Sequence, residues 1–389
     1  MEPIPRSRGR RAVDFITVGV FALVIGLPVF GLFFRKPPKL EENRARYTFP
    51  PISMERYVLQ DFPRHFELYL GDHIGYRDVL LAWHRRAMYG LLDEPVTAQA
   101  WIGSDGWFYL NQSDPYRGNP KKPSANARTD LWVEALAERD AWFRAQGIEY
   151  IVLLAPDKAA VYPEHLRGYP QRHPPLELAT PVAEKLKARG VTCVNLLPAI
   201  RAEKARHPEL LYYFKTDSHW TPDGGRAAYH SAADAVRERF PDFRAHPDRD
   251  YTFGTNPGGD LRALAGIRDD VPMEFARTYV PLTPIDYRAT HGYFSPAQKA
   301  EQLDKNPIPI STSPSATGPK MLFLHDSFGA FLWPFVASDF RQASSIGTYG
   351  VPLEAVRIEQ PKLVIQLLVA RQLYSFIPSN PPEIAKGSR

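Results

Sequence analysis

The sequence predicts an α/β fold, in which a parallel sheet is covered by helices on both faces and is preceded by one transmembrane helix. Short, unbroken apolar stretches alternate with helical patterns, and such strands are typical of parallel sheets buried on both faces. The clearest stretches are YIVLL (150–154), VTCVNLL (191–197) and LVIQLL (363–368). The transmembrane helix is predicted from Phe15–Phe34, a 20-residue run without charge that is long enough to cross a hydrocarbon core.

The basic residues before this run predict its orientation. Four arginines lie within residues 6–11, and Lys and Arg favour the cytoplasmic side of a membrane. Residues 1–39 are therefore expected to form a cytoplasmic tail and a signal-anchor helix, and residues 40–389 an exported domain. A cleaved signal peptide is the alternative, but its apolar core is usually about 7–15 residues long and ends at a small-residue cleavage site. The run here is longer and lacks an A-x-A site, which favours an uncleaved anchor.

Charge and cysteine content exclude several classes of function. Residues 1–39 hold seven Lys and Arg against two Asp and Glu, so the other 41 basic and 41 acidic residues give the exported part no net charge. A nucleic-acid-binding protein would carry a basic stripe, and none is visible in the sequence. Cys193 is the only cysteine, which excludes an intramolecular disulfide and a multi-cysteine metal site. No metal or nucleotide motif is present, so no cofactor is expected.

The first exported segments are predicted to be helical and then to form a hairpin. A Pro-containing, charged link covers residues 35–51. Apolar residues recur at helical spacing over residues 62–92, with a break around Gly71–Gly75. The stretch WIGSDGWFYL (101–110) places a Ser-Asp-Gly turn between aromatic-rich edges, which is typical of a short β-hairpin.

Helix and strand signals alternate from residue 129 onward. Thr129 is expected to cap a helix that ends at Gln146, with Gly147 as its stop. A second helix is predicted to run from about Val182 to Gly190, directly before the apolar stretch 191–197.

Thr221-Pro222 predicts the start of a third helix, which ends near Phe240. Thr is favoured at the N-cap and Pro at the first helical position. Residues 241–320 are rich in Pro, Gly and Asp and are expected to be an insertion or long loops, and residues 321–324 are expected to be a strand.

Ser327 lies where the strand 321–324 ends, in MLFLHDSFG. Ligands bind at the carboxyl ends of the strands in an open parallel sheet. If a helix begins at Ser327, the first backbone N–H groups are free and can bind a developing oxyanion, while Gly329 lets an acyl group approach. The segment therefore fits a nucleophilic serine on a strand–turn–helix. The alternative is that Ser327 or Asp326 only caps the helix.

A base for such a serine is predicted at His219. Asp217 and His219 lie two residues apart in YYFKTDSHWTPDGG (212–225), and in an extended segment such side chains point the same way. One carboxylate can then orient one imidazole, as nucleophilic catalysis requires. The alternative is a solvated loop with a capping aspartate and an incidental histidine.

Six motifs in order along the chain resemble one family. They are DHIGYRD (72–78), IGSDGWFYL (102–110), APDKAAVYPEHL (155–166), TDSHWT (216–221), GGDLRALAGI (258–267) and FLHDSFG (323–329). Together they resemble the SGNH-hydrolase-like domain of the bacterial alginate O-acetyltransferases AlgJ and AlgX, which has a flavodoxin-like parallel sheet. The likeness covers most of residues 40–375. It departs from the family pattern at His325, which stands where the family has Gly, and at Ala370, which stands where the family has Glu before Arg371.

The resemblance implies roles for individual residues. Ser327 matches the nucleophile, His219 the general base and Asp217 the residue that orients it. Asp326 is expected to be structural, and His325 either crowds the site or joins it.

Three further residues are expected to bind substrate. Trp220 and Trp333 are candidates for stacking on sugar faces, with a place in the core as the alternative for each. Lys158 is a candidate for contact with an acidic sugar, with a surface salt bridge as its alternative.

The resemblance also implies a function. The chain is expected to be a periplasmic O-acetyltransferase, anchored in the inner membrane, that moves acetyl groups onto an alginate-like exopolysaccharide through an acetyl-serine. Its expected partners are the polysaccharide, an integral-membrane acyltransferase that supplies the acetyl group, and exopolysaccharide assembly proteins. A carbohydrate acetyl esterase with the same triad and a non-catalytic polysaccharide-assembly scaffold are the alternatives.

Overall fold

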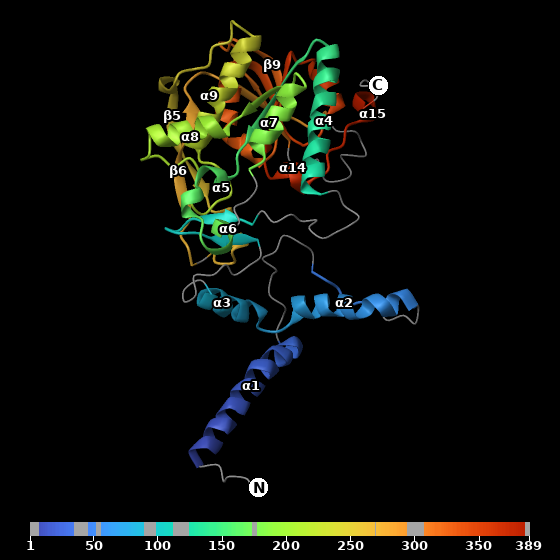
Figure 1. Ribbon diagram of the computed structural model, residues 1–389, viewed down its shortest axis with the longest axis vertical. Helices are drawn as coiled ribbons and strands as arrows, with labels where there is room; N and C mark the ends of the chain where they lie inside the picture. Colours follow the sequence, from blue (N-terminus) through green and yellow to red (C-terminus); the bar gives the residue numbers. More distant parts are fainter. Residues whose placement is uncertain are drawn as a thin grey trace. The chain divides into compact units, whose positions relative to one another are not determined.

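A computed structural model describes residues 8–34, 46–51, 56–88, 99–111, 124–172, 177–268, 270–293 and 307–385 (Figure 1). The chain divides into two compact units. The first comprises residues 1–97 with 266–270, and the second comprises residues 98–265 with 271–389. The predicted boundary between residues 39 and 40 and most of the link 35–51 lie outside the described residues.

The first unit is helical. Helix α1 (Arg8–Phe34) contains a 19-residue stretch, Asp14–Leu32, that is long and apolar enough to cross a membrane. Helices α2 (Arg56–His73) and α3 (Arg77–Ala87) follow, so the predicted break in the helical pattern near Gly75 is confirmed. The last residues of that pattern, 89–92, lie outside the described residues.

The second unit begins with the predicted hairpin. Strands β1 (Ala100–Ile102) and β2 (Phe108–Leu110) pair antiparallel, with Ala100 opposite Leu110. Gly106 in the turn has a φ of +76°, a conformation that glycine adopts without steric cost.

A seven-stranded sheet with the order β4-β3-β11-β9-β10-β8-β7 forms the centre of this unit. Its parallel strands are β4 (Thr192–Asn195), β3 (Glu149–Ala155), β11 (Leu363–Val369), β9 (Gly318–His325) and β10 (Phe340–Gly347). The predicted parallel sheet is confirmed. Strand β10 gave no apolar run because its sequence, FRQASSIG, is largely polar.

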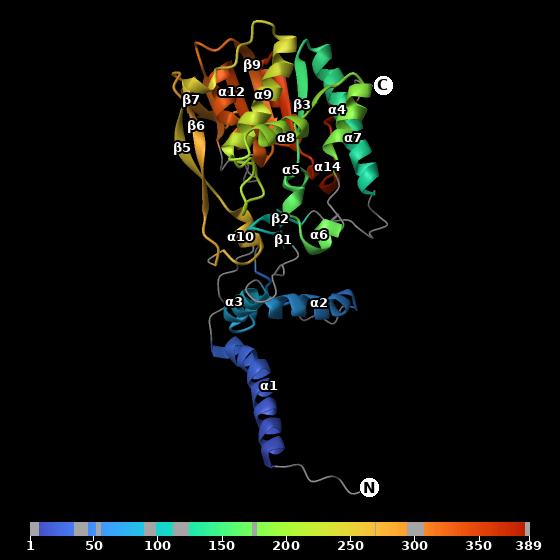
Figure 2. The ribbon, with the colours of Figure 1, turned by 60° about the vertical axis from the view of Figure 1, so that its left-hand side comes forward.

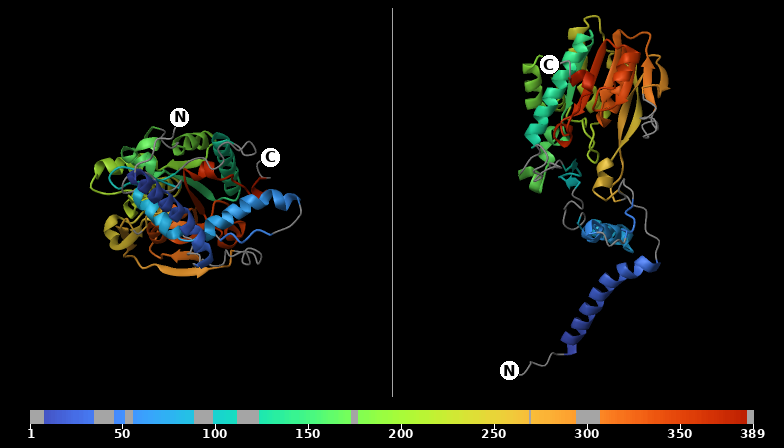
Figure 3. Two further views of the ribbon diagram at one scale, coloured as in Figure 1. Left: turned by 90° about the horizontal axis from the view of Figure 1, so that it is seen from below. Right: turned by 90° about the vertical axis from the view of Figure 1, so that its right-hand side faces the viewer.

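Helices cover both faces of the sheet, as predicted. Alternate side chains of β11 enter two apolar cores: Ile365 and Leu367 pack in one, and Val364 and Leu368 in the other. The first core includes residues of α8 (Leu197–Arg206), α9 (Pro222–Arg239) and α12 (Trp333–Asp339), and Figure 2 shows α8 and α9 in front of the sheet. The second core includes residues of α4 (Ala125–Ala145), α7 (Ala179–Ala188) and α13 (Leu353–Glu359). Figure 3 gives two further views of these layers.

One predicted helix start was wrong. The N-cap of α4 is Ser124, whose Oγ accepts a hydrogen bond from the N–H of Ala127 at 3.2 Å. Thr129 lies one turn inside the helix, where its hydroxyl donates to the carbonyl of Asn126 at 2.6 Å. Both residue types favour N-caps, so the sequence pattern alone does not choose between them.

The segment 241–320, expected to be an insertion or long loops, contains regular structure. Strands β5 (Tyr251–Gly258) and β6 (Glu274–Pro281) form a separate antiparallel pair. Strand β8 (Ile308–Thr312) extends the central sheet by pairing antiparallel with β10, and β7 (Asp286–Thr290) pairs antiparallel with β8 and forms the edge. The short helix α10 (Asp260–Leu264) follows β5.

Candidate active site

The carboxyl end of β9 leads directly into Ser327. A 3₁₀-helix, η5 (Ser327–Phe331), starts at this residue, and Asp326 is its N-cap. One Asp326 oxygen accepts from the N–H of Phe328 at 3.0 Å, and the other accepts from the N–H of Val369 in β11 at 2.7 Å. The prediction that Asp326 is structural is confirmed, because its carboxylate joins the turn at Ser327 to the neighbouring strand.

A second loop, residues 212–221, brings His219 to Ser327. A bridge between Tyr213 and Trp220 closes the loop. Thr221 caps α9 by accepting from the N–H of Gly224 at 3.2 Å, as the Thr-Pro pair predicts. The loop therefore ends at a fixed helix start, two residues after His219.

Ser327, His219 and Asp217 form one chain of hydrogen bonds. His219 Nε2 lies 2.7 Å from Ser327 Oγ, and His219 Nδ1 lies 2.7 Å from an Asp217 oxygen. A carboxylate can only accept, so Nδ1 carries the proton and Nε2 accepts from the serine hydroxyl. This is the geometry in which a histidine activates a serine for attack on an acyl group.

Asp217 is held in the ionised form. Burial raises the pKa of its carboxyl, but hydrogen bonds from His219 and from the N–H groups of Asp260 and Gly259 outweigh burial and lower the pKa overall. The N–H of Gly259 donates to the second Asp217 oxygen at 2.6 Å, and the N–H of Asp260 donates to the same oxygen at 2.9 Å. The carboxylate is therefore fixed at both ends, by the imidazole and by the segment after β5.

Asp260 is a second carboxylate beside the imidazole. One of its oxygens lies 3.5 Å from His219 Nδ1, and its carboxylate accepts from both the N–H and the hydroxyl of Ser218 at 2.6 Å and 2.5 Å. Burial and the charge of Asp217 raise its pKa. The stretch GGDLRALAGI is part of the family resemblance, but sequence reasoning gave Asp260 no role because its contact with residue 219 exists only in the folded chain.

Asp217, His219 and Asp260 are also a set whose potential metal-ligand atoms lie within 4.8 Å of one another. The carboxylate oxygens already accept hydrogen bonds from backbone N–H groups and from Ser218. A cation would have to replace these donors, so the set fits a hydrogen-bonded network better than a metal centre.

The expectation for Lys158 was wrong in both of its forms. Its side chain is 3% exposed, too buried for a surface salt bridge or an open sugar contact. Its ammonium donates to the carbonyls of Phe214 and Lys215 at 2.9 Å each and lies 5.4 Å from the centre of the Tyr109 ring.

Glu274 accepts from the N–H groups of Lys215 and Thr216. The side chains of Lys158 and Glu274 thus hold the backbone just before Asp217.

Burial of Lys158 predicts a pH-dependent stability. Burial lowers the pKa of Lys158 from 10.5 to about 7, although Glu274, Asp260 and Asp217 oppose this shift. Between about pH 7 and pH 10 the folded chain binds fewer protons than the unfolded chain, so the contribution of Lys158 to the free energy of unfolding rises with pH. The measurement is denaturant unfolding of wild type and Lys158→Met across this range. As pH increases, the free energy of unfolding of wild type should rise relative to that of the variant.

The matched control for this experiment is Lys187→Met, at an exposed position of α7. It should leave the pH dependence of wild-type unfolding unchanged. A constant difference between wild type and Lys158→Met from pH 6 to pH 10 would show that the buried ammonium does not titrate on folding.

The two tryptophans have different positions. Trp220 is fully buried, and its indole N–H donates to the carbonyl of Phe328 at 3.1 Å. The prediction that it stacks on a sugar was wrong, because the ring instead joins the loop of His219 to the helix of Ser327. Trp333 is half-buried at the start of α12 and packs against the first apolar core, and its sugar contact stays a prediction.

His325 neither crowds the triad nor joins it. Its Nδ1 lies 2.6 Å from the Asp326 carbonyl oxygen and its Nε2 lies 2.7 Å from Ser345 Oγ on β10. Burial lowers the pKa of the imidazole, which favours the neutral ring. Gly329 is needed because a Cβ there would lie 2.2 Å from His325 Cγ. Sequence reasoning had assigned this glycine to the acyl group instead.

Gly329→Ala is expected to destabilise the fold by about 1–3 kcal/mol, the usual cost of overpacking a dense core. His325→Ala in the same chain should recover most of this loss, since the clash is with the His325 ring. Denaturant unfolding of the two single variants and the double variant measures the coupling. Strictly additive losses would mean that the added methyl group meets a different obstacle.

Arg371 forms a buried ion pair under the site. Its guanidinium donates to Asp157 at 2.9 Å and lies 5.0 Å from the centre of the Phe328 ring. Ala370, at the position where the family pattern has Glu, is buried at the end of β11. The sequence departure therefore lies in the second apolar core, and the Arg371–Asp157 pair forms with alanine at position 370.

Comparisons with known proteins find one matching family and several relatives. Residues 100–318 match the family described as the SGNH hydrolase-like domain of the acetyltransferase AlgX. This range contains Asp217 and His219, and Ser327 lies beyond its end. Proteins named probable alginate O-acetylase AlgJ are 26% identical over 200 residues in Pseudomonas fluorescens and 26% identical over 141 residues in Pseudomonas aeruginosa. The matches cover 49% and 35% of this chain and 46% and 33% of those relatives, so the chain spans less than half the length of each.

One solved structure shows a similar fold with a TM-score above 0.5. Bacillus cereus PatB1 with a sulfonyl adduct has a TM-score of 0.51 at 15% identity, covering 71% of this chain and 97% of PatB1. The O-acetyltransferase domain of Pseudomonas putida AlgJ has a TM-score of 0.44 at 18% identity, covering 75% of this chain and 99% of that domain.

Proposed function

Because the chain belongs to the SGNH hydrolase-like family of the acetyltransferase AlgX, we propose that it is an O-acetyltransferase in which Ser327 carries the acetyl group. The observation that carries this proposal is the hydrogen-bonded chain from Ser327 through His219 to Asp217, with 2.7 Å at each step. The names of the AlgJ relatives support acetyl transfer as the reaction.

In the first step, Ser327 Oγ attacks the carbonyl carbon of an acetyl donor, and His219 Nε2 takes the serine proton. The bond between the acetyl carbon and the donor breaks, and His219 returns the proton to the leaving group. Asp217 stabilises the imidazolium that forms in between, as its low pKa permits. The product is an acetyl ester on Ser327.

In the second step, a hydroxyl group of the acceptor glycan attacks the acetyl-serine. His219 takes the hydroxyl proton and gives it to Ser327 Oγ as the serine ester breaks. The acetyl group is then an ester of the glycan, and the enzyme returns to its starting state.

The oxyanion of both steps has one backbone donor near the serine. The N–H of Phe328 donates to the Asp326 side chain and the N–H of Gly329 donates to the Asp326 carbonyl. Among the described contacts, the Ser327 N–H has no acceptor, so it is the N–H of this turn left for the oxyanion. From the sequence, the N–H groups of the residues next to Ser327 were also expected to bind the oxyanion.

The location and partners form part of the same proposal. The apolar helix Asp14–Leu32 and the arginines before it support an inner-membrane anchor with the second unit in the periplasm. An integral-membrane acyltransferase would supply the acetyl group, and assembly proteins would present the exopolysaccharide. An anchor in the same membrane as the donor raises its effective concentration.

The test uses the full chain in detergent micelles with p-nitrophenyl acetate as donor, with and without alginate. Acetyl ester appearing on the alginate supports transfer. Release of free acetate alone, with alginate present, would identify an acetyl esterase for this acceptor. Nitrophenolate release no faster than without protein would favour a non-catalytic scaffold.

A further inference from the structure

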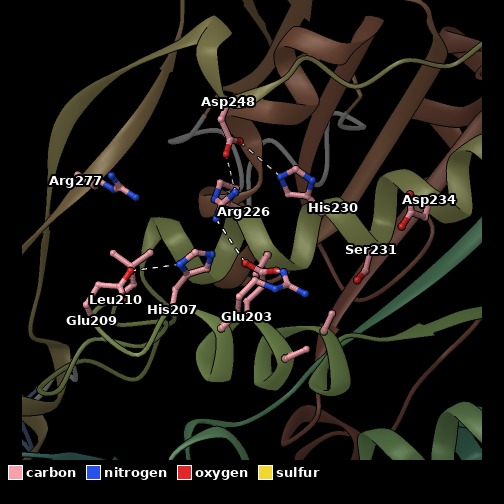
Figure 4. Close-up of a pocket in the computed structure, with 14 residues that line it drawn as sticks. Glu203, His207, Glu209, Leu210, Arg226, His230, Ser231, Asp234, Asp248 and Arg277 are labelled. Carbon is pink, nitrogen blue, oxygen red and sulfur yellow. Dashed lines mark hydrogen bonds and ion pairs between the residues drawn. The ribbon is translucent and has the colours of Figure 1, made fainter.

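A cavity of about 770 Å³ lies beside the middle of α9, outside the triad. Figure 4 shows its lining residues, which come from α8, the loop after α8, α9 and strand β6. Asp248, in the short helix η3 (Asp248–Asp250), closes one side. Its volume is typical of a ligand site rather than of a packing gap, since such sites usually enclose about 300–1,000 Å³.

The centre of the cavity is Arg226. Its guanidinium donates to Asp248 at 2.8 Å, and a second nitrogen lies 3.9 Å from Glu203 (Figure 4). Its Nε is buried and has no hydrogen-bond partner. Buried polar atoms are rarely left unpaired, so the acceptors of the chain itself do not saturate the Arg226 guanidinium.

The charges of the lining indicate what kind of ligand fits. The lining contains three arginines and four carboxylates, and its other members are two histidines, three alanines, one leucine and one serine. A phosphate or a polyuronate would meet more negative than positive charge here. Sugar hydroxyls each donate and accept, so they suit a wall that presents both guanidinium donors and carboxylate acceptors. Ala202, which is exposed on α8, offers a small apolar contact for the carbon–hydrogen face of a sugar ring.

The cavity is connected to the triad through two elements. Helix α9 begins at Pro222, three residues after His219, and Arg226 lies about 6 Å further along its axis at 1.5 Å per residue. On β6, Glu274 holds the loop before Asp217, and Arg277 reaches the cavity three residues later. Phe275, 66% exposed, lies between them and points to the same face of the strand as Arg277.

We propose that this cavity binds an uncharged, hydroxyl-rich segment of the acceptor glycan, several sugars away from the hydroxyl that receives the acetyl group. The inference rests on the proposed transfer to a glycan and narrows it: this part of the acceptor is a neutral saccharide rather than a polyuronate. Phe275, exposed on the same face of β6 as Arg277, would offer an aromatic face to a neighbouring sugar.

The test measures binding without catalysis. Full-length Ser327→Ala protein in detergent micelles is titrated with cellotetraose and with tetragalacturonate, followed by saturation-transfer NMR. Two further variants carry a tryptophan on α8: Ala202→Trp, which fills the cavity, and Ala205→Trp, an exposed position of the same helix that does not line it. Both positions are on the surface, so neither substitution disturbs the core.

The expected result is that cellotetraose binds more tightly than tetragalacturonate, that Ala202→Trp weakens its binding at least tenfold, and that Ala205→Trp leaves it unchanged. Three outcomes would each overturn the inference. Cellotetraose does not bind, or it binds equally to both tryptophan variants, or tetragalacturonate binds more tightly and Ala202→Trp blocks its binding. The proposed function fails separately: it requires acetyl transfer by the wild-type chain, which these binding measurements do not involve.

Discussion

Ser327→Ala is expected to lower acetyl transfer by about 10⁴-fold or more, the usual scale for loss of a triad nucleophile. Without Oγ, no acetyl-serine forms, and the imidazole of His219 has no hydroxyl to deprotonate at 2.7 Å. The measurement is the initial rate of nitrophenolate release from p-nitrophenyl acetate, together with acetyl ester formed on the glycan. Phenylmethanesulfonyl fluoride should label the wild-type chain at Ser327 and leave the variant unlabelled.

Ser345→Ala is the matched control. Ser345 Oγ also lies 2.7 Å from a histidine nitrogen, that of His325, but this histidine has a backbone carbonyl rather than a carboxylate beside its other nitrogen. The control should keep wild-type rates within about threefold, since no orienting carboxylate completes a triad there. Residual activity of Ser327→Ala within tenfold of wild type would remove Ser327 from the reaction.

Local sequence patterns predicted the elements that carry the site. The apolar run of β9 and the Thr-Pro start of α9 are short-range signals, because strand burial and helix capping depend on adjacent residues. They placed Ser327 at a strand end and His219 just before a helix start. The spacing of Asp217 and His219 predicted a shared direction, and the structure joins them at 2.7 Å.

The supporting contacts were not predictable in the same way. Lys158 binds carbonyl groups 56 and 57 residues further along the chain, and the N–H of Asp260 donates to Asp217 across 43 residues. Lys and Asp are usually exposed at the surface, so the sequence does not indicate that Lys158 is buried or that Asp260 contacts the loop of His219. Only the folded chain shows that both hold the loop of His219.

The edge of the sheet was missed for a related reason. Strands β7 and β8 lie in a segment rich in Pro, Gly and polar residues, and β7 has no buried residue over Asp286–Thr290. An exposed edge strand needs no apolar run, so hydrophobic patterning does not detect it. The parallel strands β3, β9 and β11 were predictable because they are largely buried on both faces, whereas β10, with its largely polar sequence, was not.

Asp217→Asn is expected to lower the turnover number by about 10⁴-fold, as loss of the orienting carboxylate does in other Ser-His-Asp enzymes. The N–H groups of Gly259 and Asp260 both donate to one Asp217 oxygen. An asparagine would direct its carbonyl oxygen to these two donors, which leaves its NH₂ group facing His219 Nδ1. The imidazole would then carry its proton on Nε2 and could not accept from Ser327. The measurements are the rate of nitrophenolate release and the ¹⁵N shifts of the two His219 nitrogens.

Asp260→Asn is the comparison that separates the two carboxylates. Asp260 lies 3.5 Å from His219 Nδ1 against 2.7 Å for Asp217, and its oxygens accept from Ser218. A hydrogen bond weakens steeply beyond about 3.2 Å, so Asp260→Asn should lower the turnover number only about tenfold and leave the proton on Nδ1. If Asp260→Asn instead costs as much as Asp217→Asn and moves the proton to Nε2, Asp260 orients the base and Asp217 serves mainly to anchor the segment after β5.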